Sequence, residues 1–108
     1  MSATPQLPHP DRDQIDLAAV LFALSDEPRL ALVRELADGP LDMGECVALG
    51  AAPKSTKSHQ AKVLREAGVV FSELVGRNRR LTLRRDDLDA RFPGLLDAIL
   101  GVGSKAPR

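Results

Sequence analysis

The stretch that decides the fold is residues 53–85, which read PKSTKSHQAKVLREAGVVFSELVGRNRRLTLRR. The first half starts polar and basic and ends apolar, as expected of a helix that packs by its end and projects its start. Pro53 suits the first helical position, where its missing N–H needs no partner. Gly68 suits the left-handed residue that terminates a helix. These signals predict a helix from Pro53 to Ala67.

The second half of the stretch predicts a β-hairpin. Two segments, Val69 to Val75 and Arg80 to Arg84, flank the tip Gly76-Arg77-Asn78-Arg79. Leucine alternates with arginine or threonine in the second segment, which is the period of a half-exposed ribbon. A basic helix followed by a basic hairpin favours a protein that lays the helix in a nucleic-acid groove and places the hairpin beside it.

Charge is distributed very unevenly along the chain. Residues 54–85 carry nine Lys and Arg against two Asp and Glu, whereas residues 1–53 carry three against nine. The formal net charge of zero therefore conceals a basic block on an acidic body. A pI near neutral argues weakly against nucleic-acid binding, but the local basic footprint is what a polyanion meets.

Further helices are predicted on both sides of this stretch, and both chain ends are predicted to be tails. The N-terminal tail, residues 1–11, is rich in proline, and His9 within it is expected to be solvated. Residues 101–108 are expected to be flexible, which leaves residues 12–100 as the folded domain. The predicted helices are Arg12–Leu24, Asp26–Ala37, Asp42–Leu49, Asp86–Arg91 and Pro93–Leu100.

Composition excludes several classes of protein. The 108 residues suit one domain, and with three Phe and no Trp or Tyr its core must be built from aliphatic side chains. The single cysteine, Cys46, excludes an intramolecular disulfide. The longest apolar run, Leu17 to Leu24, is far shorter than the roughly 20 residues of a membrane span. The N-terminus lacks the pattern of a signal peptide, so a soluble cytoplasmic protein is expected.

This order of elements resembles the ArsR/SmtB family of winged helix-turn-helix regulators, which are small dimeric bacterial transcription factors. Three segments carry the resemblance: ALSDEPRL at residues 23–30, STKSHQAKVLREAGVV at residues 55–70, and the Gly76-Arg77 wing tip. It covers roughly residues 15–100. Lys57 and Ala61 depart from it, because the family usually has larger apolar residues there. The implied fold is mostly α with a small β-hairpin wing, in the order α-α-α-α-β-β-α.

The resemblance and the basic pattern together predict the DNA-binding residues. Lysines and arginines neutralise phosphates, whereas short polar side chains touch phosphates or base edges in the major groove. The wing arginines are placed to reach an adjacent minor groove. For each residue the alternative is a merely solvated charged face. The predicted contacts are Lys54, Ser55, Thr56, Lys57, Ser58, His59, Lys62, Arg65, Arg77, Arg79 and Arg80.

The apolar terminal helices predict a dimer. The segment Leu17 to Leu24 is apolar on nearly every face, so burial on two sides is expected, one of them against a partner chain. The last helix offers a second apolar stripe. The predicted dimerisation residues are Ile15, Leu17, Val20, Leu21, Leu95, Leu96 and Ile99.

No metal site or cofactor is predicted. The family's cysteine-based sensors need at least two thiols, whereas the segment around Cys46 supplies one. Its last-helix sensors combine carboxylates with histidine, and no histidine follows His59. A lone thiol and hard carboxylates do not make a zinc, nickel or arsenic site. A redox role for Cys46 stays open beside the commoner role of a buried structural cysteine.

Three functions compete. The preferred one is a dimeric, sequence-specific repressor that reads an inverted repeat with the Pro53–Ala67 helix and the Arg77–Arg80 wing. The alternative is a winged-helix protein–protein interaction module without its own operator. An enzyme is not expected, because Cys46 and His59 are the sole nucleophile–base pair and have no third orienting group.

Overall fold

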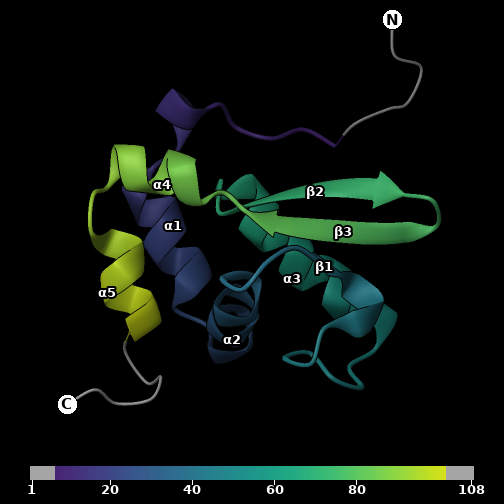
Figure 1. Cartoon of the computed structure of the whole chain (residues 1–108). Coiled ribbons are helices and arrows are strands. Elements are labelled where there is room, and N and C mark those ends of the chain that lie inside the picture. The colour runs from purple at the N-terminus through teal and green to yellow at the C-terminus, as the bar shows by residue number, and fades with distance from the viewer. Residues whose placement is uncertain (1–6, 102–108) are drawn as a thin grey trace, which may run out of the picture.

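The computed structural model describes residues 7–101 (Figure 1). The helices are α1 (Leu17–Leu24), α2 (Glu27–Leu36), α3 (Lys54–Glu66), α4 (Arg85–Arg91) and α5 (Leu95–Gly101). The strands are β1 (Leu41–Asp42), β2 (Val70–Val75) and β3 (Asn78–Leu83). Two short 3-10 turns, η1 (Arg12–Gln14) and η2 (Met43–Glu45), complete the order. The predicted fold class, mostly α with a β-hairpin wing, is confirmed.

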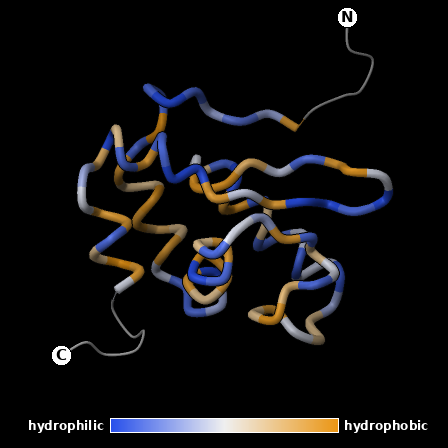
Figure 2. Tube along the Cα trace, in the orientation of Figure 1, coloured by the Kyte–Doolittle hydropathy of each residue, from blue (hydrophilic) through white to orange (hydrophobic). Residues whose placement is uncertain are grey.

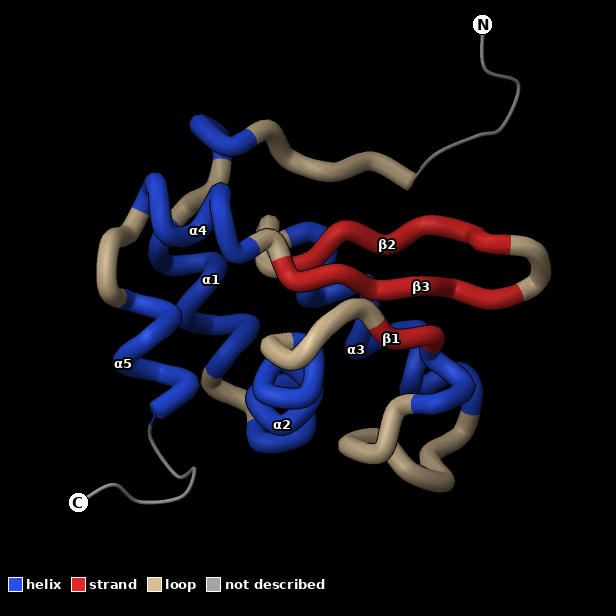
Figure 3. The backbone as a smooth tube through the Cα atoms, viewed as in Figure 1, coloured by secondary structure: helices blue, strands red, loops and turns tan. Residues whose placement is uncertain are grey.

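The strands form one antiparallel sheet in the order β1-β3-β2 (Figure 3). In the hairpin, Ser72 pairs with Leu81 and Val75 pairs with Asn78. The sequence did not predict β1, which adds Leu41 beside Leu81 on the other edge of β3. Strand β2 remains at the edge of the sheet, and the hairpin tip extends away from the helices (Figure 1).

The core is aliphatic, as composition required. Fully buried side chains come from α1, α2, α3, the sheet and the last two helices, including Val20, Leu32, Leu64, Leu81 and Leu96. Figure 2 shows hydrophobic residues along α1 and α5, and a hydrophilic tip-proximal half of β3. The helices therefore supply a packed body from which a polar wing extends.

The first predicted helix is broken. A continuous helix over residues 12–24 was expected, but η1 ends at Gln14 and α1 begins at Leu17. Asp16 adopts an extended backbone and accepts a hydrogen bond from the N–H of Ala19 at 3.1 Å, which makes it the N-cap of α1. Ile15 meanwhile turns into the core, where it is 1% exposed. The break between η1 and α1 therefore allows Ile15 to pack in the core.

The third predicted helix, Asp42–Leu49, is wrong. That segment holds the end of β1, the turn η2 and further turns. Glu35 of α2 provides the physical reason, because its carboxylate accepts the backbone N–H groups of Val47 at 2.9 Å and Ala48 at 3.0 Å. A side chain from α2 thus satisfies donors that an α-helix would otherwise pair with its own carbonyl groups.

Residues 7–11 lie alongside β2 (Figure 1). They belong to the segment for which an unstructured tail was predicted, yet they are hydrogen-bonded to the body of the domain. His9, expected to be solvated, is half-buried, and its Nε2 accepts the N–H of Ser72 at 3.0 Å. The remaining tail residues, 1–6 and 102–108, fall outside the described part of the chain.

Candidate nucleic-acid interface

Helix α3 has one face buried in the core and one face exposed. Ala61 and Leu64 are buried in the core, whereas Ser55, His59 and Lys62 are exposed. The exposed residues recur at helical spacing and form one outward ridge. The predicted helix from Pro53 to Ala67 is confirmed as Lys54–Glu66, with Pro53 at its N-cap.

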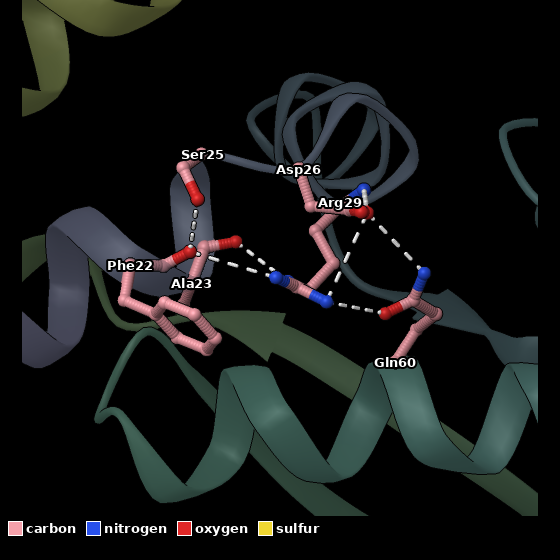
Figure 4. A network of polar contacts seen from close by, with 6 residues as sticks. All are labelled: Phe22, Ala23, Ser25, Asp26, Arg29 and Gln60. Atoms are coloured by element: carbon pink, nitrogen blue, oxygen red, sulfur yellow. Dashed lines mark hydrogen bonds and ion pairs between the residues drawn. The ribbon is translucent and has the colours of Figure 1, made fainter.

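A buried polar network fixes α3 against the two preceding helices (Figure 4). Nη1 of Arg29, in α2, donates to Oε1 of Gln60 in the middle of α3 at 2.8 Å. Its Nε donates to the carbonyl oxygen of Ala23 at the end of α1 at 2.7 Å. Asp26 accepts from Nε2 of Gln60 at 3.3 Å and from the N–H of Arg29 at 3.2 Å.

This network follows from burial. Arg29 is 7% exposed and Gln60 is 8% exposed, so each polar group needs a partner. The guanidinium group supplies several donors in a fixed plane, and it donates to both α1 and α3. The position of α3 relative to α1 and α2 is therefore specified by directional bonds as well as by packing. The sequence reasoning missed both residues, although a helix-embedded arginine among apolar neighbours was a signal.

A groove of about 460 Å³ lies between α3 and the hairpin. Its lining is strongly cationic, and no described residue that lines it is acidic. The cations are Lys54, Lys57, Lys62, Arg65, Arg77 and Arg79. Ser58, Ser72 and Asn78 add polar groups, and Met43 and Gly44 also contribute to the lining. A groove with cations on both walls is complementary to a strand of phosphates.

The structure brings most of the predicted contacts together but not all of them. Ser55, Thr56 and His59 lie outside the groove lining, and all three are exposed on α3. Arg80 also lies outside the lining, because its Nε donates to Oδ1 of Asp42 at 3.1 Å. That ion pair joins β3 to the end of β1. Asn78 lines the groove and was not predicted, although it stands between two arginines that were.

Arg65 is placed differently from the prediction. It lines the groove but is only 7% exposed. Its Nη1 donates to the carbonyl oxygen of Pro8 at 2.7 Å, so the N-terminal segment occupies the guanidinium group. This burial revises its expected role as an open phosphate contact.

The predicted dimerisation residues divide into two groups. Leu17 and Leu21 are 43% and 46% exposed on α1. Leu95 and Ile99 of α5 are half-buried. Ile15, Val20 and Leu96 are at most 1% exposed within the single chain, which revises the expectation that they face a partner. Phe22, which was not predicted, is 66% exposed on the same helix as Leu21.

Cys46 is buried and bonded rather than reactive. Its Sγ lies 3.7 Å from Oε1 of Glu35, the carboxylate that also holds the following backbone. Burial raises the pKa of the Cys46 thiol, and the negative charge of Glu35 adds to the effect, against opposing backbone hydrogen bonds. Such a thiol is mostly protonated and poorly nucleophilic at neutral pH. Within residues 7–101, no group of three or more His, Cys, Asp or Glu side chains gathers where it could hold a metal ion.

A recognition-type helix and a wing on either side of a cationic groove define a winged helix-turn-helix nucleic-acid-binding fold. Comparison with known proteins agrees. The chain is 37% identical over 89 residues to the uncharacterized HTH-type transcriptional regulator YceK of Bacillus subtilis (strain 168), covering 81% of this chain and 88% of that protein. It is 31% identical over 74 residues to the HTH-type transcriptional regulator NmtR of Mycobacterium tuberculosis, covering 68% of this chain and 62% of that protein.

Among solved structures, the ArsR family transcriptional regulator RHA00566 superposes with a TM-score of 0.64 at 21% identity, over 76% of this chain and 90% of that one, and it supports the fold. No protein-family model matches the sequence. The chain belongs to the ArsR family of winged helix-turn-helix, DNA-binding transcriptional regulators. In the described part of the chain, no helix combines the length and apolarity needed to cross a bilayer.

Proposed function

We propose that this chain is a dimeric, sequence-specific repressor that binds an inverted-repeat operator. The observation that carries the proposal is the cationic groove between α3 and the wing. In this arrangement α3 enters a major groove, the wing reaches toward the neighbouring minor groove, and the phosphate strand between them runs along the cationic groove. Groove cations then supply affinity, while the exposed residues of α3 outside the groove supply base contacts.

The division of α3 supports separate roles for its residues. Lys54, Lys57 and Lys62 line the groove and are assigned to phosphates, together with Arg77 and Arg79 of the wing. Ser55, Thr56 and His59 are exposed outside it and are assigned to base edges or flanking phosphates. Their short polar groups can donate and accept, as the varied edges of a major groove require.

Dimerisation is proposed through α1 and α5. Leu17, Leu21 and Phe22 place an exposed apolar face on α1, and a face of this kind on a small domain favours association. A two-fold pair of such chains presents two copies of α3. Two copies fit half-sites about one helical turn apart, which is the geometry of a palindromic operator.

The proposal is tested by gel shift and fluorescence anisotropy with DNA from upstream of the chain's own gene, at low salt. We expect retardation at submicromolar protein, a dimer in light scattering, and a steep loss of affinity with salt. Absence of binding by a folded dimer in dilute buffer would refute the proposal. A folded monomer without salt-dependent DNA affinity would instead favour the interaction-module function.

A further inference from the structure

The N-terminal segment Leu7–Asp11 is tied to the DNA-facing side of the domain by three hydrogen bonds from different elements. Arg65 of α3 donates to the carbonyl oxygen of Pro8 at 2.7 Å, and Arg84, which follows β3, donates to that of Pro10 at 2.8 Å. Between them, the N–H of Ser72 donates to Nε2 of His9 at 3.0 Å. Here the term strap denotes residues 7–11.

The strap reaches the candidate interface itself. Leu7 lines the cationic groove together with Arg65, Lys62 and Ser58. Arg65 is only 7% exposed, and its partner on the strap is a neutral carbonyl oxygen. A phosphate oxygen is a stronger partner for a guanidinium group than a carbonyl oxygen is, because both partners are then charged. The strap therefore occupies a cation that DNA can claim only after the strap has moved.

His9 holds the middle of the strap through a bond that depends on its protonation state. Ser72 is 2% exposed on the edge strand β2, and its N–H needs an acceptor. Neutral imidazole supplies one at Nε2, whereas imidazolium has a proton on both nitrogens and supplies none. Protonation of His9 therefore removes this hydrogen bond and leaves the N–H of Ser72 facing the N–H at Nε2 of the imidazolium.

We propose that the strap competes with DNA for Arg65 and that protonation of His9 releases it, so that DNA affinity rises as the pH falls. This inference rests on the proposed DNA-binding function. Release exposes Arg65 and adds one cation to the groove. DNA binding in turn favours the open strap, since the two processes share one side chain.

The charges around His9 favour its neutral form. Burial lowers the pKa of His9, and the positive charges of Arg65 and Arg84 lower it further, against a backbone hydrogen bond with Leu7 that raises it. Arg84 is paired with Asp87 at 2.8 Å, and Arg65 has Glu66 at 4.0 Å. Two exposed carboxylates stand nearby in sequence: Asp11 is two residues after His9, and Glu73 follows Ser72. The phenyl ring of Phe71, 5.6 Å from the imidazole centroid, covers another side.

The test uses a His59→Gln background, because His59 is the other histidine of the chain and stands on the exposed face of α3. Without DNA, NMR of His9 and of the Ser72 amide against pH reports whether the strap opens. We expect both signals to titrate together, with a midpoint below the ordinary histidine value. If the His9 and Ser72 signals titrate independently, or if the Ser72 amide does not respond to pH, the proposal that His9 holds the strap is overturned.

DNA affinity is then measured by fluorescence anisotropy at pH 5.5 and pH 8 with fixed salt. The His59→Gln protein should bind more tightly at the lower pH, by roughly fivefold per protomer as expected of one added surface charge contact, with a salt slope steeper by about 0.9 per protomer. His9→Gln keeps an acceptor that does not titrate, so its affinity should stay at the pH 8 value. His9→Ala should bind at both pH values like the parent at pH 5.5. Arg65→Ala should remove the pH difference.

The outcomes distinguish a failure of the proposed DNA-binding function from a failure of the strap proposal. If the strap opens with pH but neither the unsubstituted protein nor any variant binds DNA at either pH, the proposed function fails. If DNA binds and His9→Gln retains the full pH difference, the strap proposal fails while the proposed function stands. Equal affinity of His9→Ala and His9→Gln at pH 8 would also overturn competition for Arg65.

Discussion

Nη1 of Arg29 lies 2.8 Å from Oε1 of Gln60 and joins the first turn of α2 to the middle of α3. The same guanidinium group reaches the carbonyl oxygen of Ala23 at the end of α1. Its Cζ also lies over the exposed ring of Phe22, 5.6 Å from the ring centroid. One buried side chain therefore connects the proposed dimer face to the helix whose exposed ridge is proposed to face DNA.

Breaking this connection should destabilise the domain. We expect Gln60→Met to lower the free energy of unfolding by about 1–3 kcal/mol, because it deprives a buried guanidinium group of one partner. Arg29→Met should cost about 3 kcal/mol, since it removes the donor to the carbonyl oxygen of Ala23 and to Oε1 of Gln60. Urea denaturation of both single variants and of the double variant gives the coupling free energy between Arg29 and Gln60. A coupling energy near zero would show that the 2.8 Å bond does not join the two helices energetically.

The wing arginines should contribute affinity without sequence information. Arg77 lines the groove at the hairpin tip and Arg79 lines it from β3. Replacing both with alanine should weaken specific and random duplexes alike and reduce the salt slope by about 1.8 per protomer. Arg85→Ala is the control, because this arginine pairs with Asp97 at 3.2 Å in α5. A changed sequence preference would show instead that the wing reads bases.

An acidic side chain on the exposed face of α1 should prevent pairing of two chains. Leu21→Asp places a carboxylate where the proposed partner packs, and burying an unpaired charge is costly. We expect a monomer in sedimentation velocity and a fall of roughly tenfold or more in operator affinity. Val47→Asp is the matched control, since Val47 is 80% exposed on the turn before α3. A dimeric Leu21→Asp protein would place the interface elsewhere.

Gly68 should tolerate no larger residue at the junction of α3 and β2. Its φ is +86°, and an added Cβ would lie 2.6 Å from Cγ1 of Ile15. Gly76, at the wing tip, has φ of +65° but open space around it. Gly76→Ala should therefore cost about 1–2 kcal/mol for backbone strain alone. Gly68→Ala should cost about 1–3 kcal/mol more for the collision, and equal melting temperatures would contradict this account.

Asp87 should make the domain sensitive to acid. Its carboxylate accepts from Nε of Arg12 and from Nε of Arg84, both at 2.8 Å. Burial acts to raise the pKa of Asp87, but these two hydrogen bonds and the arginine charges outweigh it and hold the pKa below its ordinary value. A lowered pKa in the folded state means that the contribution is complete above the ordinary value of 3.8 and is lost as the pH falls through the folded pKa.

Asp87→Asn should accordingly lower the unfolding free energy by about 2 kcal/mol at pH 7 and by less at pH 3. Urea denaturation across this range measures the difference. Asp86→Asn is the control, because Asp86 is exposed on the same helix. A loss that stays constant with pH would show that Asp87 acts by packing and not by charge.

Local signals sufficed for the elements that carry the interface. The proline and glycine at the ends of α3, the apolar period of α2 and the alternation in β3 were all readable in the sequence, and the structure has each element within about two residues. Element boundaries of this kind depend on neighbours along the chain, such as caps and turn residues. The block of cations at residues 54–85 was equally visible before any fold was known.

The sequence analysis could not assign the residues whose role depends on distant partners. Residues 42–49 have helical spacing, but the carboxylate of Glu35 draws their backbone into turns. Arg65 has the composition of a phosphate contact, but the carbonyl oxygen of Pro8, 57 residues away in sequence, occupies it. His9, in a proline-rich start, has Ser72 as its partner across 63 residues.

The sequence by itself determined the class of fold, the basic helix with its wing, and the aliphatic character of the core, because periodicity, caps and charge are properties of neighbouring residues. Tertiary structure alone decided which cations line the groove, which of the apolar residues in α1 and α5 remain exposed, and how Arg29 and Gln60 fix α3. Those outcomes depend on burial and on hydrogen bonds between residues far apart in the chain, and a buried polar group must take whatever partner the packed fold brings within reach.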